Sequence, residues 1–501
     1  MQTPTGLTDD VVAPTVGSLY VWGKDTGGNL GTVALDRESE CALPTRVPQL
    51  DGVQSVACGE SATAAITASD GALWCWGAAH PRLGLGDRTN EINLRLPQRV
   101  SLPERAVQIV FGETHVLCIT IDGRCWSWGK GNNGCLGDGD TTLRHERTSP
   151  GPVLSSKGGA PLGPAVQVGA GFDLSVALLA SGEVCSWGRN DHGQLGIGRA
   201  GGCAAWPQRV QLPPAGHQEG DRGAEGNGSA PPQAVAATSI ACGSLYAGCV
   251  TADGAAYLWG YGLAGNLGCG GRPRAATRPV RAQLPPDARA EALACTVGQS
   301  NAAGNGADGL EGPHTLLVCE GGALYAFGTH HKGLCGNMTR KALRCGDRDA
   351  DELVPYRIGG LPADTGTSGA GGAERSVRAA TGYLDGVRCV LPLSAHIHNA
   401  VLDSEGRLWA FGCGSGGRLG LSIYLTGLHG AKSRMKTYVV RPTQVELPVP
   451  GGGVVLHAAT SRRCMAAVVA PRRDSRAGAA SVADQPQRRT CDHEDGLQIL
   501  T

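Results

Sequence analysis

The sequence predicts an all-β fold, a seven-bladed β-propeller of four-stranded antiparallel blades whose ring is closed by strands from both ends of the chain. An aromatic residue that is followed by Gly and has another Gly five positions before it occurs seven times, and in six of these cases a further Gly follows nine positions later. Gly accounts for 78 of 501 residues, but chance does not give it a fixed position relative to the aromatic residues. We predict that these aromatic residues pack between neighbouring blades as structural anchors; they are Trp22, Trp76, Trp128, Trp187, Trp259, Phe327 and Phe411.

Each repeat contains the strands that one blade needs. In the second repeat, two runs of apolar and β-branched residues, 53–59 and 62–67, precede a third run at 72–77. An Asp-Gly pair at Asp70 separates the last two, and this pair is typical of a hairpin because its turn needs positive φ at both central residues. A fourth, outer strand is expected to begin near a Pro that is followed three residues later by a β-branched residue. The prolines in this position are Pro44, Pro97, Pro207, Pro355 and Pro442.

The two ends of the chain supply complementary parts of one blade. The N-terminal part supplies only the last strand of a repeat, 17–23, whereas the C-terminal part supplies the first two strands, 454–459 and 465–469. Pairing these segments completes the ring and covers strand edges that would otherwise be exposed.

The distances between successive aromatic residues indicate where the repeats are enlarged. They run 54, 52, 59, 72, 68 and 84 residues, so the later repeats contain insertions. We predict a propeller over 15–470, an N-terminal tail over 1–14 and a polar, disordered C-terminal tail over 471–501. Loop insertions are expected near 213–234, 299–313, 361–375 and 421–440.

Composition and charge argue against several classes of protein. Lys plus Arg and Asp plus Glu balance at 44 each, which disfavours a nucleic-acid or anionic-membrane surface spread over the whole molecule. We find no secretory signal near the start and no apolar run of about 18 residues that would span a membrane. The 19 cysteines are odd in number and several lie within apolar runs, which favours a reducing compartment. We therefore expect an intracellular protein of the cytoplasm or the nucleus.

The repeat resembles that of the regulator of chromosome condensation family. Its fullest copies are 128–137 and 187–196, and the resemblance extends from residue 15 to about residue 470. It implies a seven-bladed propeller that binds proteins, since the founding member is a nuclear exchange factor for the small GTPase Ran and relatives act as scaffolds, ubiquitin-ligase modules and ultraviolet sensors. The family often carries a His three residues after the inner-strand Gly. Here only His115 keeps it, and the basic N-terminal tail of the founding member is missing.

No residue pattern indicates catalysis, a cofactor or a metal. Neither a Ser-His-Asp arrangement nor a pair of carboxylates can be singled out, so we do not expect an enzyme that acts through its side chains. His396 and His398 alternate along a predicted strand and are interpreted as ordinary edge residues. The insertion after Phe327 carries zinc-type ligands whose spacing matches no closed zinc site. These ligands are His330, His331, Cys335 and Cys345.

The leading hypothesis is a non-enzymatic interaction scaffold, a rigid disc whose face loops and insertions dock other proteins. The alternative is a guanine-nucleotide exchange factor for a Ran-like small GTPase, which needs no catalytic triad because it stabilises the nucleotide-free GTPase. A short basic segment beside apolar residues is the candidate partner-binding loop, with a solvated charged turn as the other interpretation; it contains Lys432, Arg434 and Lys436. We expect a monomeric ring or a subunit of a larger complex, with protein partners and with neither nucleic acid nor membrane.

Overall fold

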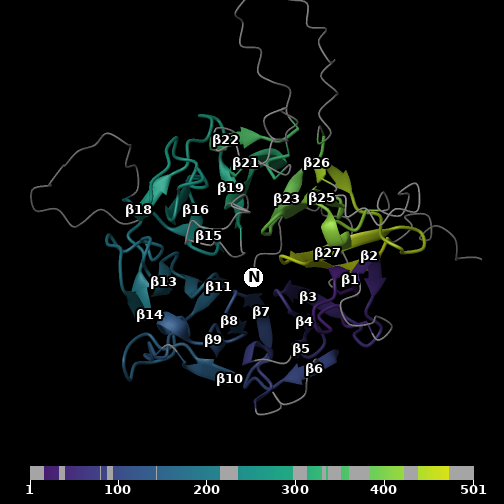
Figure 1. Ribbon diagram of the computed structural model, residues 1–501, viewed down its shortest axis with the longest axis horizontal. Helices are drawn as coiled ribbons and strands as arrows, with labels where there is room; N and C mark the ends of the chain where they lie inside the picture. Colours follow the sequence, from purple (N-terminus) through teal and green to yellow (C-terminus); the bar gives the residue numbers. More distant parts are fainter. Residues whose placement is uncertain are drawn as a thin grey trace, which may run out of the picture.

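The protein folds into a ring of blades around a central axis (Figure 1). The computed structural model describes residues 16–32, 40–78, 81–86, 94–142, 144–214, 235–296, 313–329, 334–336, 351–359, 384, 386–421 and 438–472. These residues contain 28 strands in seven four-stranded antiparallel sheets, which confirms the predicted seven-bladed propeller. In the part of the chain so described, no helix is long and apolar enough to cross a membrane.

Each blade runs from an inner strand at the axis to an outer strand at the rim (Figure 1). Blade 1 contains β27 (Gly453–Thr460), β28 (Cys464–Pro471), β1 (Ser18–Lys24) and β2 (Glu40–Arg46); blade 2 contains β3 (Val53–Cys58), β4 (Ala62–Thr67), β5 (Leu73–Gly77) and β6 (Leu94–Val100); blade 3 contains β7 (Ala106–Phe111), β8 (His115–Thr120), β9 (Cys125–Lys130) and β10 (Glu146–Pro152). Blade 4 contains β11 (Ala165–Ala170), β12 (Leu174–Leu179), β13 (Val184–Arg189) and β14 (Cys203–Arg209); blade 5 contains β15 (Ala237–Cys242), β16 (Tyr246–Thr251), β17 (Ala256–Gly260) and β18 (Ala276–Arg281). Blade 6 contains β19 (Ala290–Cys295), β20 (His314–Cys319), β21 (Ala323–Gly328) and β22 (Glu352–Arg357); blade 7 contains β23 (Cys389–Ser394), β24 (His398–Asp403), β25 (Leu408–Cys413) and β26 (Tyr438–Gln444). Short 3-10 turns lie at η1 (Pro81–Leu83), η3 (Asn132–Gly134), η4 (Glu320–Gly322) and η7 (Ser415–Gly417).

Burial along a blade follows the position of each strand. The second strands, such as β4 and β8, are buried along their whole length because the neighbouring blades cover both of their faces. Inner strands such as β3 contain both buried and half-buried positions, and outer strands such as β6 are mostly half-buried or exposed. This explains why the second strands read as continuous apolar runs without a polar face.

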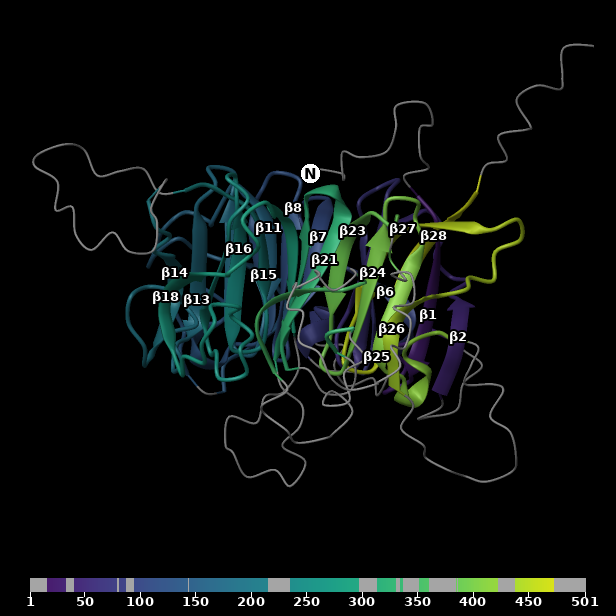
Figure 2. The same cartoon turned by 90° about the horizontal axis from the view of Figure 1, so that it is seen from above.

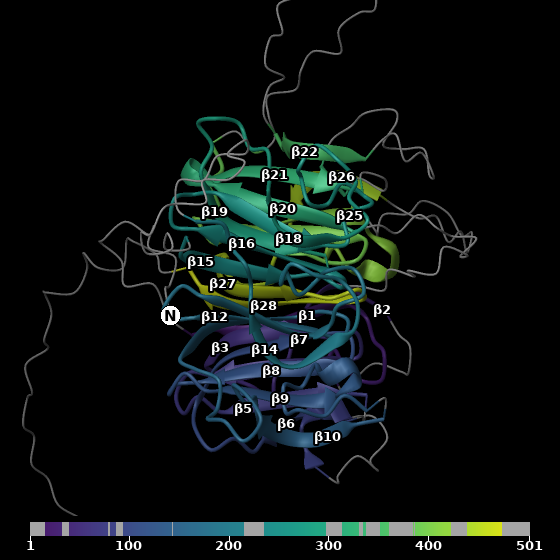
Figure 3. The same ribbon diagram turned by 90° about the vertical axis from the view of Figure 1, so that its left-hand side faces the viewer.

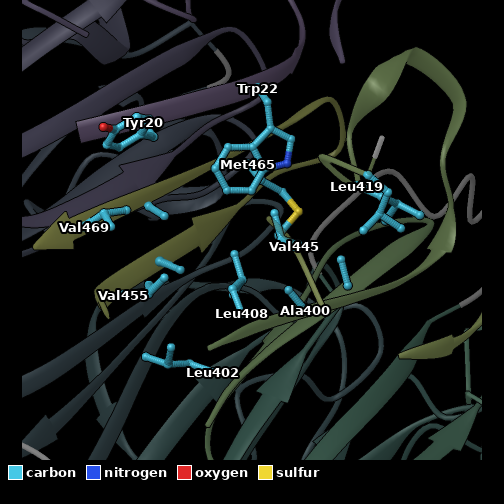
Figure 4. Close-up of a cluster of buried hydrophobic side chains, with 14 residues drawn as sticks. Tyr20, Trp22, Ala400, Leu402, Leu408, Leu419, Val445, Val455, Met465 and Val469 are labelled. Atoms are coloured by element: carbon cyan, nitrogen blue, oxygen red, sulfur yellow. The ribbon is translucent and has the colours of Figure 1, made fainter. Parts of the chain in front are cut away.

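Strands from both ends of the chain complete blade 1. β1 pairs on one side with β28, where Trp22 lies opposite Met465, and on its other side with β2. Figure 4 shows the core that results, with Trp22 and Met465 packed against Leu408, Leu419 and residues around them from blade 7. The predicted ring closure is confirmed. The N-terminal part contributes two strands to it, however, and not one, because the outer strand of the first repeat pairs with β1.

The seven aromatic residues that recur in the repeats lie between blades and are fully buried. The indole nitrogen of Trp187 donates a hydrogen bond to the carbonyl oxygen of Cys135 in the preceding blade, at 2.9 Å, and Trp76 does the same to Asn29 at 3.0 Å. In five blades the Gly nine residues after the aromatic residue faces the aromatic residue of the next blade, and Gly84, eight residues after Trp76, does the same. Gly137 has a φ of +69°, and a Cβ on it would lie 2.9 Å from the indole nitrogen of Trp187. The recurring Gly is therefore required both by its backbone conformation and by the adjacent ring.

A Pro interrupts every outer strand opposite the large aromatic residue. In blade 2, Cys75 pairs with Gln98 and Gly77 pairs with Leu94, so a three-residue bulge that ends at Pro97 lies opposite Trp76. The expectation that these prolines begin the outer strands is wrong, because each lies inside its strand. A bulge on an edge strand accepts Pro since the missing N–H breaks no ladder hydrogen bond there. The seven residues are Pro44, Pro97, Pro150, Pro207, Pro279, Pro355 and Pro442.

Candidate functional site

The two flat faces of the disc are formed by different sets of loops. The strands run through the thickness of the disc (Figures 2 and 3), so the loops that join the first to the second strand of each blade gather around the axis at one end. We call these the axial loops and that end the axial face. The hairpins between second and third strands lie at the other end, the hairpin face. The described axial loops are 59–61, 112–114, 171–173, 243–245, 395–397 and 461–463.

Backbone hydrogen bonds join neighbouring axial loops to one another. The amide of Glu113 donates to the carbonyl oxygen of Gly171 at 3.0 Å, and the amide of Phe172 donates to that of Ser244 at 3.0 Å. The amide of Ser244 continues the series to the carbonyl oxygen of Thr296 at 3.1 Å. Loops from blades 3 to 6 are thus held in fixed positions relative to one another.

Glu113 extends across this face. The hydroxyl of Ser244, two blades away, donates a hydrogen bond to its carboxylate at 2.6 Å. Burial raises the pKa of Glu113, an effect that the hydrogen bond from Ser244 opposes. Glu60 and Asp173 add negative charge nearby and raise the pKa further, whereas His396 lowers it.

Arg82 supports two of the axial loops from below. It belongs to η1 and is only 6% exposed. Its guanidinium donates to the carbonyl oxygen of Glu113 at 2.9 Å and to the hydroxyl of Ser61 at 3.2 Å. Burial lowers the pKa of Arg82 to about 10, while the charges of Glu60 and Glu113 act in the opposite direction. The side chain stays charged near neutral pH and fixes the loops of blades 2 and 3.

Accessible charge on the axial face comes from Glu60 and two arginines of blade 1. The Glu60 carboxylate lies 3.5 Å from the guanidinium of Arg463 and 3.8 Å from that of Arg462, and all three side chains are about a third exposed. Half-exposed pairs of this kind contribute little stability, so these charges are available for contact with another molecule. Phe172 lies in the same ring of loops, with the guanidinium of Arg189 5.5 Å from its ring centre.

In three blades a His begins the second strand and joins that blade to the next one. His115 lies opposite Gly129, His314 opposite Gly328 and His398 opposite Gly412, so three blades carry His at one equivalent position. The sequence interpretation recognised only His115, because the other two histidines lack the preceding Gly. The interpretation of His398 as an edge residue is also wrong, since it is fully buried in a second strand. His396 lies in an axial loop and is 3% exposed.

These histidines hydrogen-bond across the blade boundaries. His115 Nε2 lies 2.7 Å from the hydroxyl of Ser175, and His398 Nε2 lies 2.7 Å from that of Thr460. His314 Nε2 lies 2.8 Å from the amide oxygen of Asn399. Burial lowers the pKa of His115 to about 3, so the ring is neutral at physiological pH. Burial also lowers the pKa of His398. The three histidines therefore join neighbouring blades beneath the axial face, and His115 and His398 do so as neutral rings.

Sequence comparison identifies the family to which this arrangement belongs. Residues 9–304, more than half of the chain, match the family model of the RCC1-like domain. The chain belongs to the RCC1-like domain family. The ultraviolet-B receptor UVR8 of Arabidopsis thaliana is 28% identical over 351 residues, which cover 63% of this chain and 73% of UVR8. The E3 ubiquitin-protein ligase HERC2 of Homo sapiens is 30% identical over 275 residues, which cover 52% of this chain but only 5% of HERC2.

Solved structures of RCC1-like proteins share the fold. Human WBSCR16 aligns with a TM-score of 0.66 and 19% identity over 90% of this chain and 100% of its own. Prp20p of Saccharomyces cerevisiae, described for its binding to Gsp1p and histones, aligns with a TM-score of 0.66 and 17% identity over 92% and 93% of the two chains. At this level of identity the match concerns the fold.

The remaining predicted site residues of this RCC1-like chain do not form a site within the described residues. Lys432, Arg434 and Lys436 lie outside the described residues, in the segment that joins β25 to β26. Of the four zinc-type ligands only Cys335 is described; it is buried, and its thiol donates to the carbonyl oxygen of Thr329 at 3.6 Å. Across the described ranges, no group of three or more His, Cys, Asp or Glu side chains is arranged to hold a metal ion.

Sequence reasoning did not identify Glu60, Glu113, Arg82 or Arg463 in this RCC1-like chain. A signal was present for the first two, because each follows the Gly that ends an inner strand, at Gly59 and Gly112. Only alignment of the repeats by strand register shows that Glu60 and Glu113 occupy equivalent positions in two axial loops.

Replacement of Glu113 by Gln is expected to stabilise the protein at neutral pH. Because burial raises the pKa of Glu113, the stability linked to this group is present below the ordinary Glu value of about 4.3 and is lost as pH rises through the raised value. Gln does not ionise and still accepts from Ser244. We expect the Tm of Glu113→Gln to match wild type at pH 4 and to exceed it by about 2 °C at pH 7.5. The exposed Glu104→Gln serves as control, and an equal difference at both pH values contradicts the argument.

Proposed function

We propose that this protein is a non-enzymatic interaction scaffold that docks protein partners on its axial face. The proposal depends on a difference between the contacts that join the blades and the side chains of the axial loops. The inter-blade contacts repeat around the ring, whereas equivalent positions of the axial loops hold chemically different side chains. The residues that occupy one such position in blades 1 to 5 and in blade 7 are Arg462, Glu60, Glu113, Phe172, Ser244 and His396.

A rigid ring with a non-repeating face favours recognition of a folded partner. The hydrogen-bonded axial loops lose little conformational entropy on binding, so their mixed charges and Phe172 are pre-organised for contact. Relatives support protein partners in general, since Prp20p is described for its binding to Gsp1p and histones. We also propose that the protein acts in the cytoplasm or nucleus, because its many free thiols suit a reducing compartment.

The second candidate is guanine-nucleotide exchange on a Ran-like GTPase. It is favoured by the resemblance of this fold to that of Prp20p over more than nine-tenths of both chains. The axial face then has the task of holding the nucleotide-free GTPase, and the exposed charges of Glu60, Arg462 and Arg463 are the groups available for it.

The deciding experiment measures release of fluorescent guanine nucleotide from purified Ran with a stoichiometric amount of this protein. Strong acceleration together with a stable nucleotide-free complex identifies an exchange factor; no acceleration on Ran or on a panel of GTPases leaves the scaffold. Partner capture then compares wild type with the axial-face double variant Arg462→Glu/Arg463→Glu. The matched control is Arg105→Glu, an exposed arginine on the hairpin face. Partners lost with the first variant and kept with the second support docking on the axial face, and the reverse result contradicts it.

A further inference from the structure

The hairpin face carries a repeated arginine with a nearby carboxylate. Five outer strands place an Arg opposite the same position of their third strand: Arg46, Arg99, Arg209, Arg281 and Arg357. Arg99 pairs with Asp70 at 3.3 Å, Arg209 with Glu183 at 3.1 Å and Arg46 with Asp51 at 2.7 Å. Burial tends to raise the pKa of Asp253, but hydrogen bonds from Thr251 and Ala255 lower it, and the charge of Arg281 adds a smaller lowering effect. Three of these arginines therefore form an ion pair, and a fourth lies near a carboxylate.

Blade 6 keeps the arginine and lacks the carboxylate. Strand register aligns Gly321 with Asp253 and Ala323 with Glu183, so neither hairpin position offers an acid to Arg357. Gly321 has a φ of +76°, whereas the aligned Asp70 and Asp253 do not have positive φ, so the turn of blade 6 also differs in backbone conformation. Arg357 is exposed, and it has no ion pair or hydrogen-bond partner among the described residues.

A second arginine lies beside the first at a pocket between blades 6 and 7. Arg388 immediately precedes β23, and its backbone lies against Gly322, where a Cβ would meet it at 2.5 Å. Its counterpart in blade 6, Arg289, pairs with Glu320 at 3.3 Å, but the residue equivalent to Glu320 in blade 7 is Ser404. Arg388 is likewise exposed and without a charged partner in the described part of the chain.

Both arginines line one pocket of about 200 Å³. The lining also includes the buried apolar residues Leu324, Ile358 and Leu384 and several glycines of the adjoining turns. Two arginines beside apolar residues in one pocket suit an anionic oxygen group carried on a short apolar stem, because charge-assisted hydrogen bonds from Arg are strong and directional. The volume accommodates a single side chain and not a nucleotide or a cofactor.

We propose that Arg357 and Arg388 form a binding pocket for one anionic side chain of a peptide, a carboxylate or a phosphate monoester. The anion takes the place of the carboxylates that neutralise the equivalent arginines of blades 2, 4 and 5. The site lies on the hairpin face, so it is independent of the docking proposed for the axial face.

The test measures fluorescence anisotropy of labelled nine-residue peptides with Leu on each side of a central residue that is phosphoserine, Glu or Ser. We expect the phosphoserine or the Glu peptide to bind and the Ser peptide not to bind. Stronger binding of phosphoserine identifies a phosphate site, and equal or stronger binding of Glu identifies a carboxylate site. Absence of binding by both anionic peptides, or equal binding of all three, overturns the proposal.

Variants connect this binding to the pocket. Arg357→Gln and Arg388→Gln should each weaken the better peptide at least ~10-fold, the usual effect of losing a hydrogen bond to a charged group. Arg209→Gln, the same position in blade 4, should leave binding unchanged. Ala323→Glu places a carboxylate where blade 4 has Glu183, and it should abolish binding although both arginines remain. Unchanged affinity in Ala323→Glu, or an equal loss in Arg209→Gln, contradicts the assignment.

Discussion

Deletion of Thr15 to Gly23 opens the ring and removes most of the stability of the protein. This segment contains nearly all of β1, which lies between β2 and β28 and buries Leu19, Val21 and Trp22 to 1% exposure or less. Burial of these three side chains contributes on the order of 6 kcal/mol, which is comparable with the whole stability of a typical domain. We expect the Tm measured by circular dichroism to fall by at least ~10 °C, or the cooperative transition to disappear.

Two further measurements make this result specific. Deletion of residues 1–13, which the sequence assigns to a tail, should leave the Tm unchanged. Addition of a synthetic peptide of residues 15–31 should restore part of the lost stability, because it supplies the missing strand and the turn after it. An unchanged Tm after removal of Thr15 to Gly23 would falsify the closure.

Replacement of Trp187 by Ala is expected to have the largest effect of any single anchor substitution that we consider. The side chain is fully buried between blades 3 and 4, among Leu117, Val153 and Ala177. A cavity of this size costs about 3–5 kcal/mol. Urea denaturation followed by tryptophan fluorescence and circular dichroism should show a corresponding decrease in the free energy of unfolding.

Trp187→Phe is the matched control. Blades 6 and 7 use Phe327 and Phe411 at this position, so a smaller aromatic ring is compatible with the interface. Phe loses the hydrogen bond to the carbonyl of Cys135, but that oxygen still accepts from the hydroxyl of Ser175 at 2.8 Å. We expect a loss of about 1–2 kcal/mol. Equal losses for Ala and Phe would mean that the hydrogen bond, and not packing, determines the effect.

Several features of the fold are decided by local chemistry and can therefore be predicted from the sequence. The fixed distance from Trp187 to Gly196 reflects a single contact, since a Cβ on Gly196 would lie 3.0 Å from the indole nitrogen of Trp259. The hairpin at Asp70 is also a local feature, but only Gly71 has a positive φ, of +62°, so the expected turn with positive φ at both central residues is wrong. Because such contacts recur in each blade, the number of blades and the shared closing blade follow from counting them.

The prolines of the outer strands illustrate where sequence patterns mislead. Pro97 occurs where a strand start was expected, but its true position is a bulge opposite Trp76. The same residue type suits both positions, since each lacks a ladder hydrogen bond, so only the pairing register separates them. His314 and His398 went unrecognised for the related reason that insertions and a changed neighbour remove the local pattern.

The sequence by itself determined the architecture of this protein, because blade packing depends on contacts between residues at constant separation along the chain. The tertiary structure alone decided which side chains meet at the two faces. Glu113 and Ser244 are 131 residues apart, and Arg357 and Arg388 belong to different blades. Their proximity depends on the closed ring, which brings loops from distant repeats to one axis and to shared blade boundaries, and no local pattern in the chain encodes such distances.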